Sequence, residues 1–324
     1  MINYNLFGEE VSAVTQTPKK RIGKSENRLV NVASVPQRSP FRYPGGKTWL
    51  IPTVRQWLKQ NVGPSRSLRD GGAEGRAAGW SDPPAARPVP LLIEPFCGGG
   101  IVSLTAAFEH LAQQVLMTEL DPEIAAVWQV IFSSENQWLA ERILHFDLTL
   151  ENAKAVIEKP DKQLCDLAFS TILKNRIYHG GIIAKGSAPL KNGENGRGIK
   201  SRWYAQTLYD RITTIQQILD RVSFRQEDAF QILEEYRDRE DCYFFIDPPY
   251  TVAGKRLYTF YDLDHAKLFE YTARLRGRFM LTYDDTPEIR HLAERFGLAY
   301  KTIPMKTTHH LEKQEILITD NLNW

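Results

Sequence analysis

The chain has 324 residues, 42% of them hydrophobic and 25% charged, which suits one large α/β domain with a smaller insertion. Forty-one basic and 39 acidic residues give a net charge of +2, which neither requires nor excludes a nucleic-acid partner. The three cysteines are far apart, which argues against a disulfide framework and against a zinc site. No run of about 18 apolar residues and no signal-peptide pattern occurs, so we expect a cytoplasmic protein that is neither secreted nor membrane-spanning.

Two segments lack any regular hydrophobic pattern. Residues 1–38 carry a basic patch at Lys19–Arg21 and are expected to form a flexible arm. A solvated terminus is the simpler explanation of this patch, and a tail that touches nucleic acid is the alternative. Residues 62–90 contain five glycines and five prolines, so we expect an irregular surface loop there.

A glycine pair lies in Tyr43-Pro-Gly-Gly-Lys47, directly before apolar residues with helical spacing. The segment is not a phosphate-binding P-loop, because Phe41 stands where that loop needs its first glycine. The glycines still permit close approach of the backbone to a ligand, and Lys47 could reach a carboxylate or phosphate. A plain turn before a helix is the alternative.

The apolar residues Leu91–Ile93 predict a strand that runs into Glu94-Pro-Phe-Cys-Gly-Gly-Gly100, followed by residues with helical spacing. Strand, glycine turn and helix form the first unit of a Rossmann-like nucleotide-binding half. A second predicted strand ends at Glu119, where this fold hydrogen-bonds ribose hydroxyls, and Asp121 then caps a helix. The turn lacks the full G-x-G-x-x-G spacing, which favours a nucleoside without a pyrophosphate. S-adenosylmethionine is the common ligand of that type.

The segment Tyr243–Ile246 is typical of a buried strand, and it leads into Asp247-Pro-Pro-Tyr250. Ligands of open α/β sheets bind beyond the carboxyl ends of the strands, so Asp247 faces a crevice. Its carboxylate and the Pro248 carbonyl could accept the two hydrogens of an exocyclic amine, and Tyr250 could stack on the base. A strand-ending turn is the alternative, and we interpret the second Asp-Pro-Pro, at 82–84, as loop because no apolar strand precedes it.

These three motifs, in this order, resemble the Lys motif, the cofactor glycine motif and the catalytic motif of Dam-type (alpha-class) DNA adenine N6-methyltransferases. Further similar segments are Leu173–Arg176 with Gly180-Gly181, Asp264-His265 and Gln314–Ile318. The resemblance covers most of residues 39–322. It implies an α/β fold: a Rossmann-like S-adenosylmethionine-dependent methyltransferase sheet in residues 39–140 and 221–324. A small, mainly helical target-recognition insertion is expected in 141–220.

The resemblance also implies roles for single residues. The expected catalytic residues are Asp247, Pro248, Pro249 and Tyr250. The expected cofactor contacts are Tyr43, Lys47, Glu94, Phe96, Gly98, Gly100, Glu119, Asp228 and Asp247. Two features depart from the family pattern, since Glu119 stands where an aspartate is usual and the 62–90 loop is longer than the family needs.

Residues 174–202 are rich in glycine and hold seven basic residues against one acid, Glu194. A basic loop of this kind is a plausible DNA-reading element, and a solvated surface is the alternative. The expected DNA contacts are Lys174, Asn175, Arg176, Lys185, Lys200 and Arg202. His309-His310 has no second ligand pair at usable spacing, so we predict no metal site.

Together, the sequence predicts methyl transfer from S-adenosylmethionine to the N6 amine of adenine in double-stranded DNA, with the base flipped out of the stack. A cognate restriction endonuclease of a restriction-modification system is a further expected partner. One alternative is an adenine N6-methyltransferase that acts on RNA. The other is a DNA-binding module on an inactive methyltransferase fold.

Overall fold

The computed structural model describes residues 35–42, 46–60, 87–184, 186–191, 193, 196–250, 262–306 and 312–323. The predictions for Tyr43, Lys185 and His309-His310 lie outside these ranges, as do residues 1–34 of the predicted arm and 62–86 of the predicted loop. Within the described ranges, none of the helices combines the length and the apolar character needed to cross a membrane.

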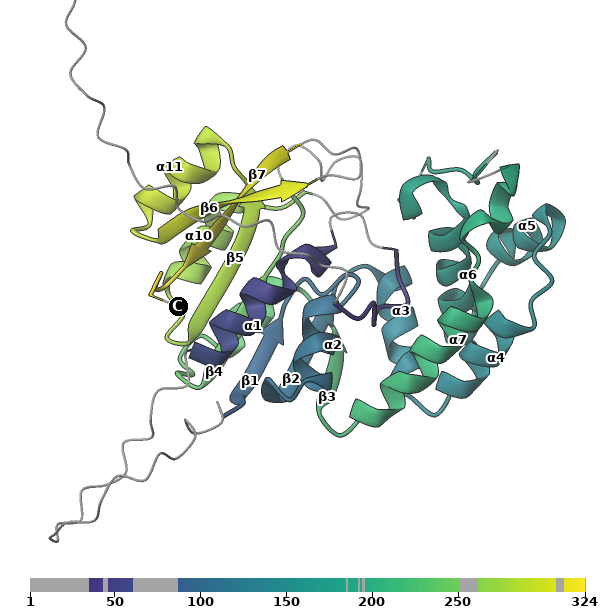
Figure 1. The fold of residues 1–324 in the computed structure, drawn as a ribbon, viewed down its shortest axis with the longest axis horizontal. Helices are drawn as coiled ribbons and strands as arrows, with labels where there is room; N and C mark the ends of the chain where they lie inside the picture. The colour runs from purple at the N-terminus through teal and green to yellow at the C-terminus, as the bar shows by residue number, and fades with distance from the viewer. Residues whose placement is uncertain are drawn as a thin grey trace, which may run out of the picture.

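Seven strands form one sheet, in the order β3-β2-β1-β4-β5-β7-β6 (Figure 1). They are β1 (Val89–Glu94), β2 (Ala112–Glu119), β3 (Val222–Gln226), β4 (Cys242–Ile246), β5 (Arg278–Asp284), β6 (Ala299–Lys306) and β7 (Glu312–Thr319). The first five strands in this order run parallel, and β7 pairs antiparallel with both β5 and β6. This topology confirms the predicted Rossmann-like α/β class.

The chain order reverses between β1 and β4, which lie side by side with Leu92 opposite Tyr243. From β1 the sheet grows outward through β2 and β3, and from β4 it grows the other way through β5. In such sheets the crevice for a ligand opens at the carboxyl ends of the two strands at this switch point. Glu94 ends β1 and Asp247 directly follows β4, so the fold brings the glycine motif and the catalytic motif to the same place.

Helices cover both faces of the sheet, which explains why its central strands are continuously apolar. All five residues of β4 are buried, and they alternate between two apolar cores. Tyr243 and Phe245 pack on the side of α1 (Ile51–Gln60), α2 (Ile101–Phe108) and α3 (Pro122–Ile131). Phe244 and Ile246 pack on the side of α8 (Ala229–Glu235), α10 (His265–Ala273) and α11 (Pro287–Arg295).

The helices between α3 and β3 gather at one end of the molecule, beyond α3, as Figure 1 shows. They are α4 (Asn136–Leu144), α5 (Leu150–Glu158), α6 (Leu164–Ile177), α7 (Ala205–Thr214) and the short 3-10 helices η3 (His179–Gly181), η5 (Gly198–Arg202) and η6 (Ile215–Ile218). Side chains such as Phe169 and Leu208 belong to the same core as α1–α3. The insertion is therefore mainly helical, as predicted, and its exact limits stay a prediction.

Candidate active site

The glycine turn after β1 is held by the packing beneath it. Gly98 and Gly100 have φ values of 45° and 62°, in the left-handed region that favours glycine. A Cβ on Gly100 would lie 2.5 Å from Met117 Cε and 2.9 Å from Trp128 Cζ2. The Trp128 indole N–H also donates to the Gly98 carbonyl over 2.8 Å. Trp128, which the sequence did not single out, therefore supports the turn from below.

Glu119 lies against this turn, at the end of β2. Its Oε2 accepts the N–H of Gly98 at 3.0 Å, and its Oε1 accepts the N–H groups of Leu120 and Asp121 at 3.0 Å each. Burial raises the pKa of Glu119 to about 7, although these hydrogen bonds act in the opposite direction. The structure thus places the predicted ribose-binding carboxylate beside the predicted glycine turn. Asp121 caps α3 through the N–H of Glu123, which confirms its predicted structural role.

Glu94 supports the turn from the interior. Its Oε2 accepts the N–H of Ser103 in the first turn of α2 at 3.0 Å, and its side chain is buried. Burial raises the pKa of Glu94 to about 8, and the nearby carboxylates of Asp247 and Glu119 contribute in the same direction. The three carboxylates are therefore close enough to interact electrically.

The pKa values of Glu94 and Glu119 in the folded protein lie above the ordinary value. The contribution of these two side chains to the stability of the fold is therefore complete below about pH 4.5. It is lost as the pH rises through about 7 and 8, because a buried carboxylate must then ionise. We expect the melting temperature of the cofactor-free protein, measured in thermal melts, to decrease as the pH is raised from 5 to 9. The decrease should be smaller in Glu94→Gln, whose neutral amide still accepts the N–H of Ser103. The exposed Glu151→Gln serves as control. Equal slopes in Glu94→Gln and the wild type would contradict this assignment.

Lys47 begins the short 3-10 helix η2 (Lys47–Leu50) and is only 3% exposed. Its Nζ lies 2.9 Å from Asp247 Oδ1, and the Thr282 hydroxyl donates to the same oxygen over 2.7 Å. In the part of the chain that the structure describes, both partners of the Asp247 carboxylate therefore bind Oδ1. Burial alone would lower the pKa of Lys47, but Asp247 and Glu315 raise it above its ordinary value, so the ammonium stays charged.

Tyr250 is anchored by residues from three other segments. Its hydroxyl donates to Glu315 Oε2 over 3.0 Å, and Lys47 Nζ lies over its ring at 4.9 Å from the centroid. The ring also stacks on Tyr283, with centroids 5.7 Å apart and an angle of 28° between the planes. Burial raises the pKa of Tyr250 well above its ordinary value, so the hydroxyl remains a donor.

Two predicted cofactor residues lie at the same edge of the sheet but are less central. Asp228 follows β3 and caps α8, because its Oδ1 accepts the N–H of Phe230 at 2.8 Å. Phe96, in the glycine turn, is partly buried against the α8–α10–α11 core. Their contacts with a cofactor remain predictions.

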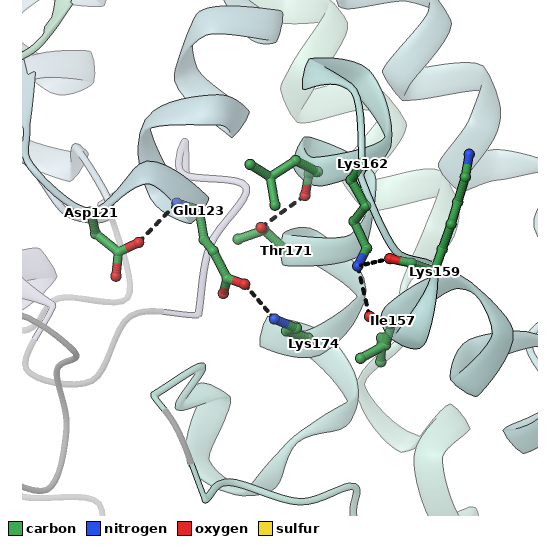
Figure 2. Close-up of polar contacts among 8 residues, drawn as sticks. Asp121, Glu123, Ile157, Lys159, Lys162, Thr171 and Lys174 are labelled. Atoms are coloured by element: carbon green, nitrogen blue, oxygen red, sulfur yellow. Dashed lines mark hydrogen bonds and ion pairs between the residues drawn. The ribbon is translucent and has the colours of Figure 1, made fainter.

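Three of the predicted DNA contacts in α6 have structural partners instead. Lys174 Nζ reaches Glu123 of α3 at 2.5 Å, a contact that Figure 2 shows between the two helices. Asn175 is only 1% exposed, accepts the N–H of Arg42 at 2.8 Å and donates to the carbonyls of Arg42 and Gly181. Its amide is fully used within the protein.

Arg176 is buried and donates to the Pro40 carbonyl. Burial, together with the guanidinium groups of Arg211 and Arg42, lowers its pKa to about 9. Asn175 and Arg176 thus hold Pro40 and Arg42 of the segment that leads to Lys47, and the DNA contacts predicted for them stay predictions. Lys200 is exposed on η5 and Arg202 is partly buried there.

A family model of the D12 class N6 adenine-specific DNA methyltransferases matches residues 87–308, which is more than half of the chain. The chain belongs to this family. The predicted resemblance is thereby confirmed, and D12 class membership makes the protein a methyltransferase. No individual curated protein matches the sequence. Within the described residues, His, Cys, Asp and Glu side chains form no group of three or more that could hold a metal ion.

Solved structures resemble this D12 class chain only distantly. The rRNA methyltransferase aviRa from Streptomyces viridochromogenes is 16% identical with a TM-score of 0.37, and the match covers 93% of this chain and 94% of that one. A precorrin-6y C5,15-methyltransferase from Geobacter metallireducens GS-15 is 10% identical with a TM-score of 0.31, covering 72% and 79% of the two chains. Similarities at this level carry no argument about the substrate.

Proposed function

We propose that the protein transfers the methyl group of S-adenosylmethionine to the exocyclic N6 amine of adenine in duplex DNA. The observation that carries this proposal is the placement of Asp247 at the switch point, with Lys47 and Thr282 both bound to Oδ1. Neither of these two described residues binds its second oxygen, Oδ2, which we assign to a hydrogen of the substrate amine. The family description supports adenine N6 as the acceptor and DNA as the nucleic acid.

The residues around the glycine turn fit this cofactor. Glu119, at the end of β2, offers a carboxylate for ribose hydroxyls. The backbone N–H of Gly98 binds this carboxylate, so the glycine turn lies directly beside it. Asp247 supplies a further carboxylate, which lies close enough to Glu94 to raise the pKa of Glu94. When bound, S-adenosylmethionine supplies an electrophilic methyl group on a positively charged sulfur.

The chain's own task is to make the adenine amine nucleophilic, because the lone pair of this nitrogen is delocalised into the ring. Asp247 Oδ2 and the Pro248 carbonyl accept the two amine hydrogens, which favours tetrahedral geometry and returns the lone pair to nitrogen. Once methylated, the amine nitrogen would carry one surplus proton, which Asp247 would accept or pass to water. Lys47 and Thr282 hold Asp247 in place for this step.

The base must leave the helical stack to reach Asp247, which costs a few kcal/mol. Stacking on Tyr250, worth about 1–3 kcal/mol, offsets part of that cost. We propose that Lys200 and Arg202 of η5 contact the DNA, since α6 uses its own polar residues internally. A restriction endonuclease partner and a cytoplasmic location stay predictions.

The function is tested by incubating the purified protein with labelled S-adenosylmethionine and either unmethylated duplex DNA or ribosomal RNA. We expect incorporation into DNA, with N6-methyladenine as the product by mass spectrometry of the hydrolysed DNA. Incorporation into RNA alone would favour the RNA methyltransferase. Binding of DNA without any S-adenosylmethionine affinity in calorimetry would favour the inactive binding module.

A further inference from the structure

Glu315 is a carboxylate in strand β7, directly before the buried residues Ile316, Leu317 and Ile318. It is 4% exposed and lies opposite Asp284, the last residue of β5. This position puts Glu315 at the same edge of the sheet as Asp247. A buried carboxylate is unfavourable unless it is paired and hydrogen-bonded, so its partners indicate its purpose.

Both described partners of Glu315 belong to the candidate active site. Its Oε2 accepts the Tyr250 hydroxyl at 3.0 Å and lies 3.9 Å from Lys47 Nζ. The prolines before Tyr250 restrict the backbone, but they leave the side-chain torsions of the tyrosine free. The hydrogen bond to Glu315 fixes the far end of the ring.

Glu315 also changes how Lys47 acts on Asp247. The ammonium lies 2.9 Å from Asp247 and 3.9 Å from Glu315, so the two carboxylates share one positive charge. Without Glu315, more of the positive charge of Lys47 would act on Asp247. A neutralised carboxylate is a weaker acceptor for the hydrogens of a substrate amine.

We propose that Glu315 is a positioning residue for methyl transfer: it orients the Tyr250 ring on which the extruded base rests, and it keeps Lys47 shared with Asp247. This inference rests on the proposed function and deepens it. Glu315 acts through Tyr250 and Lys47, so its loss lowers the rate of the chemical step more than the affinity for S-adenosylmethionine.

The test compares Glu315→Ala, Glu315→Gln and Tyr250→Phe. We expect kcat to fall about ten- to a hundredfold in Glu315→Ala and in Tyr250→Phe, with KM for S-adenosylmethionine nearly unchanged. Glu315→Gln should recover only part of the loss, because its amide oxygen still accepts the hydroxyl but carries no charge to share Lys47. The double variant Glu315→Ala/Tyr250→Phe should be little worse than Glu315→Ala alone, since both substitutions remove the same hydrogen bond.

A matched control is the pair of the partly buried Tyr300 and the exposed Glu294, whose hydroxyl and carboxylate also lie 3.0 Å apart. Tyr300→Phe and Glu294→Ala should leave kcat unchanged. A DNA duplex with 2-aminopurine at the target position adds a readout of ring orientation. We expect the emission of the bound, extruded base to be less quenched in Glu315→Ala than in the wild type.

The activity of the wild type on DNA tests the proposed function separately. The ratio of the kcat of each variant to that of the wild type is measured on whichever nucleic acid the wild type methylates. Full kcat in Tyr250→Phe and Glu315→Gln, or losses that simply add in the double variant, would overturn the positioning role. If Glu315→Ala fails to fold, the kcat values of the near-isosteric variants Glu315→Gln and Tyr250→Phe decide whether Glu315 has the positioning role. A wild type that methylates neither nucleic acid would overturn both proposals.

Discussion

Replacing Asp247 with alanine is expected to lower methyl transfer about a thousandfold or more, with DNA affinity changed by only a few fold. The carboxylate is the acceptor that polarises the amine, and it is the closer of the two that hold Lys47. Its removal takes from that buried ammonium the nearer of these two carboxylates. Single-turnover incorporation of labelled methyl groups measures the rate, and fluorescence anisotropy of a labelled duplex measures the affinity.

Two further variants make the result specific. Asp247→Asn preserves shape but turns one oxygen into a donor, so it should also lose most of the activity. Asp285→Ala removes a carboxylate that comes directly after the neighbouring strand β5 and binds Arg290 at 2.6 Å, and it should leave the rate unchanged. Turnover retained in Asp247→Ala, with DNA still bound, would refute the role assigned to this residue.

The parts of the site that the sequence could predict are those encoded locally. An apolar run that ends in Asp247-Pro-Pro-Tyr250, and another that ends in a glycine turn, each define a strand and the turn at its carboxyl end. Parallel strands share one edge for their carboxyl ends, so the approach of Glu119 to Gly98 could be expected from the order of elements. The helix cap at Asp121 was predictable for the same local reason.

Contacts between distant segments were not predictable, because sequence alone does not give the register of strands. Thr282 and Glu315 reach Asp247, Lys47 and Tyr250 only through the pairing of β5 with β4 and of β7 with β5. Glu315 comes directly after Glu312, Lys313 and Gln314, so the local sequence does not distinguish it from its polar neighbours.

In the basic segment, charge alone does not show which residues have partners inside the protein. Asn175 and Arg176 stand between Leu173 and Ile177, which are both buried in a small apolar cluster with α5. Polar residues on a buried part of a helix need partners inside the protein, and here the backbone of Pro40 and Arg42 provides them. Neighbouring apolar residues would therefore have been better evidence than net charge.

Gly100→Ala should destabilise the fold by about 2–5 kcal/mol and weaken S-adenosylmethionine binding. Part of this loss is backbone strain, because the φ of 62° is unfavourable for alanine by about 1–2 kcal/mol. The rest is overpacking. The terminal methyl of Met117 can move aside, whereas the Trp128 ring cannot shift without straining its hydrogen bond to Gly98.

Gly297→Ala separates these two effects. Gly297 has a similar φ of 66°, but its added Cβ would meet nothing within 4 Å, so this variant reports the backbone strain alone. Urea denaturation should show a larger loss for Gly100→Ala than for Gly297→Ala, and calorimetry should show weaker cofactor binding only in Gly100→Ala. Equal losses of stability in the two variants would mean that the ring of Trp128 yields freely, and the turn would then owe its shape to the backbone of the glycines rather than to the tryptophan beneath it.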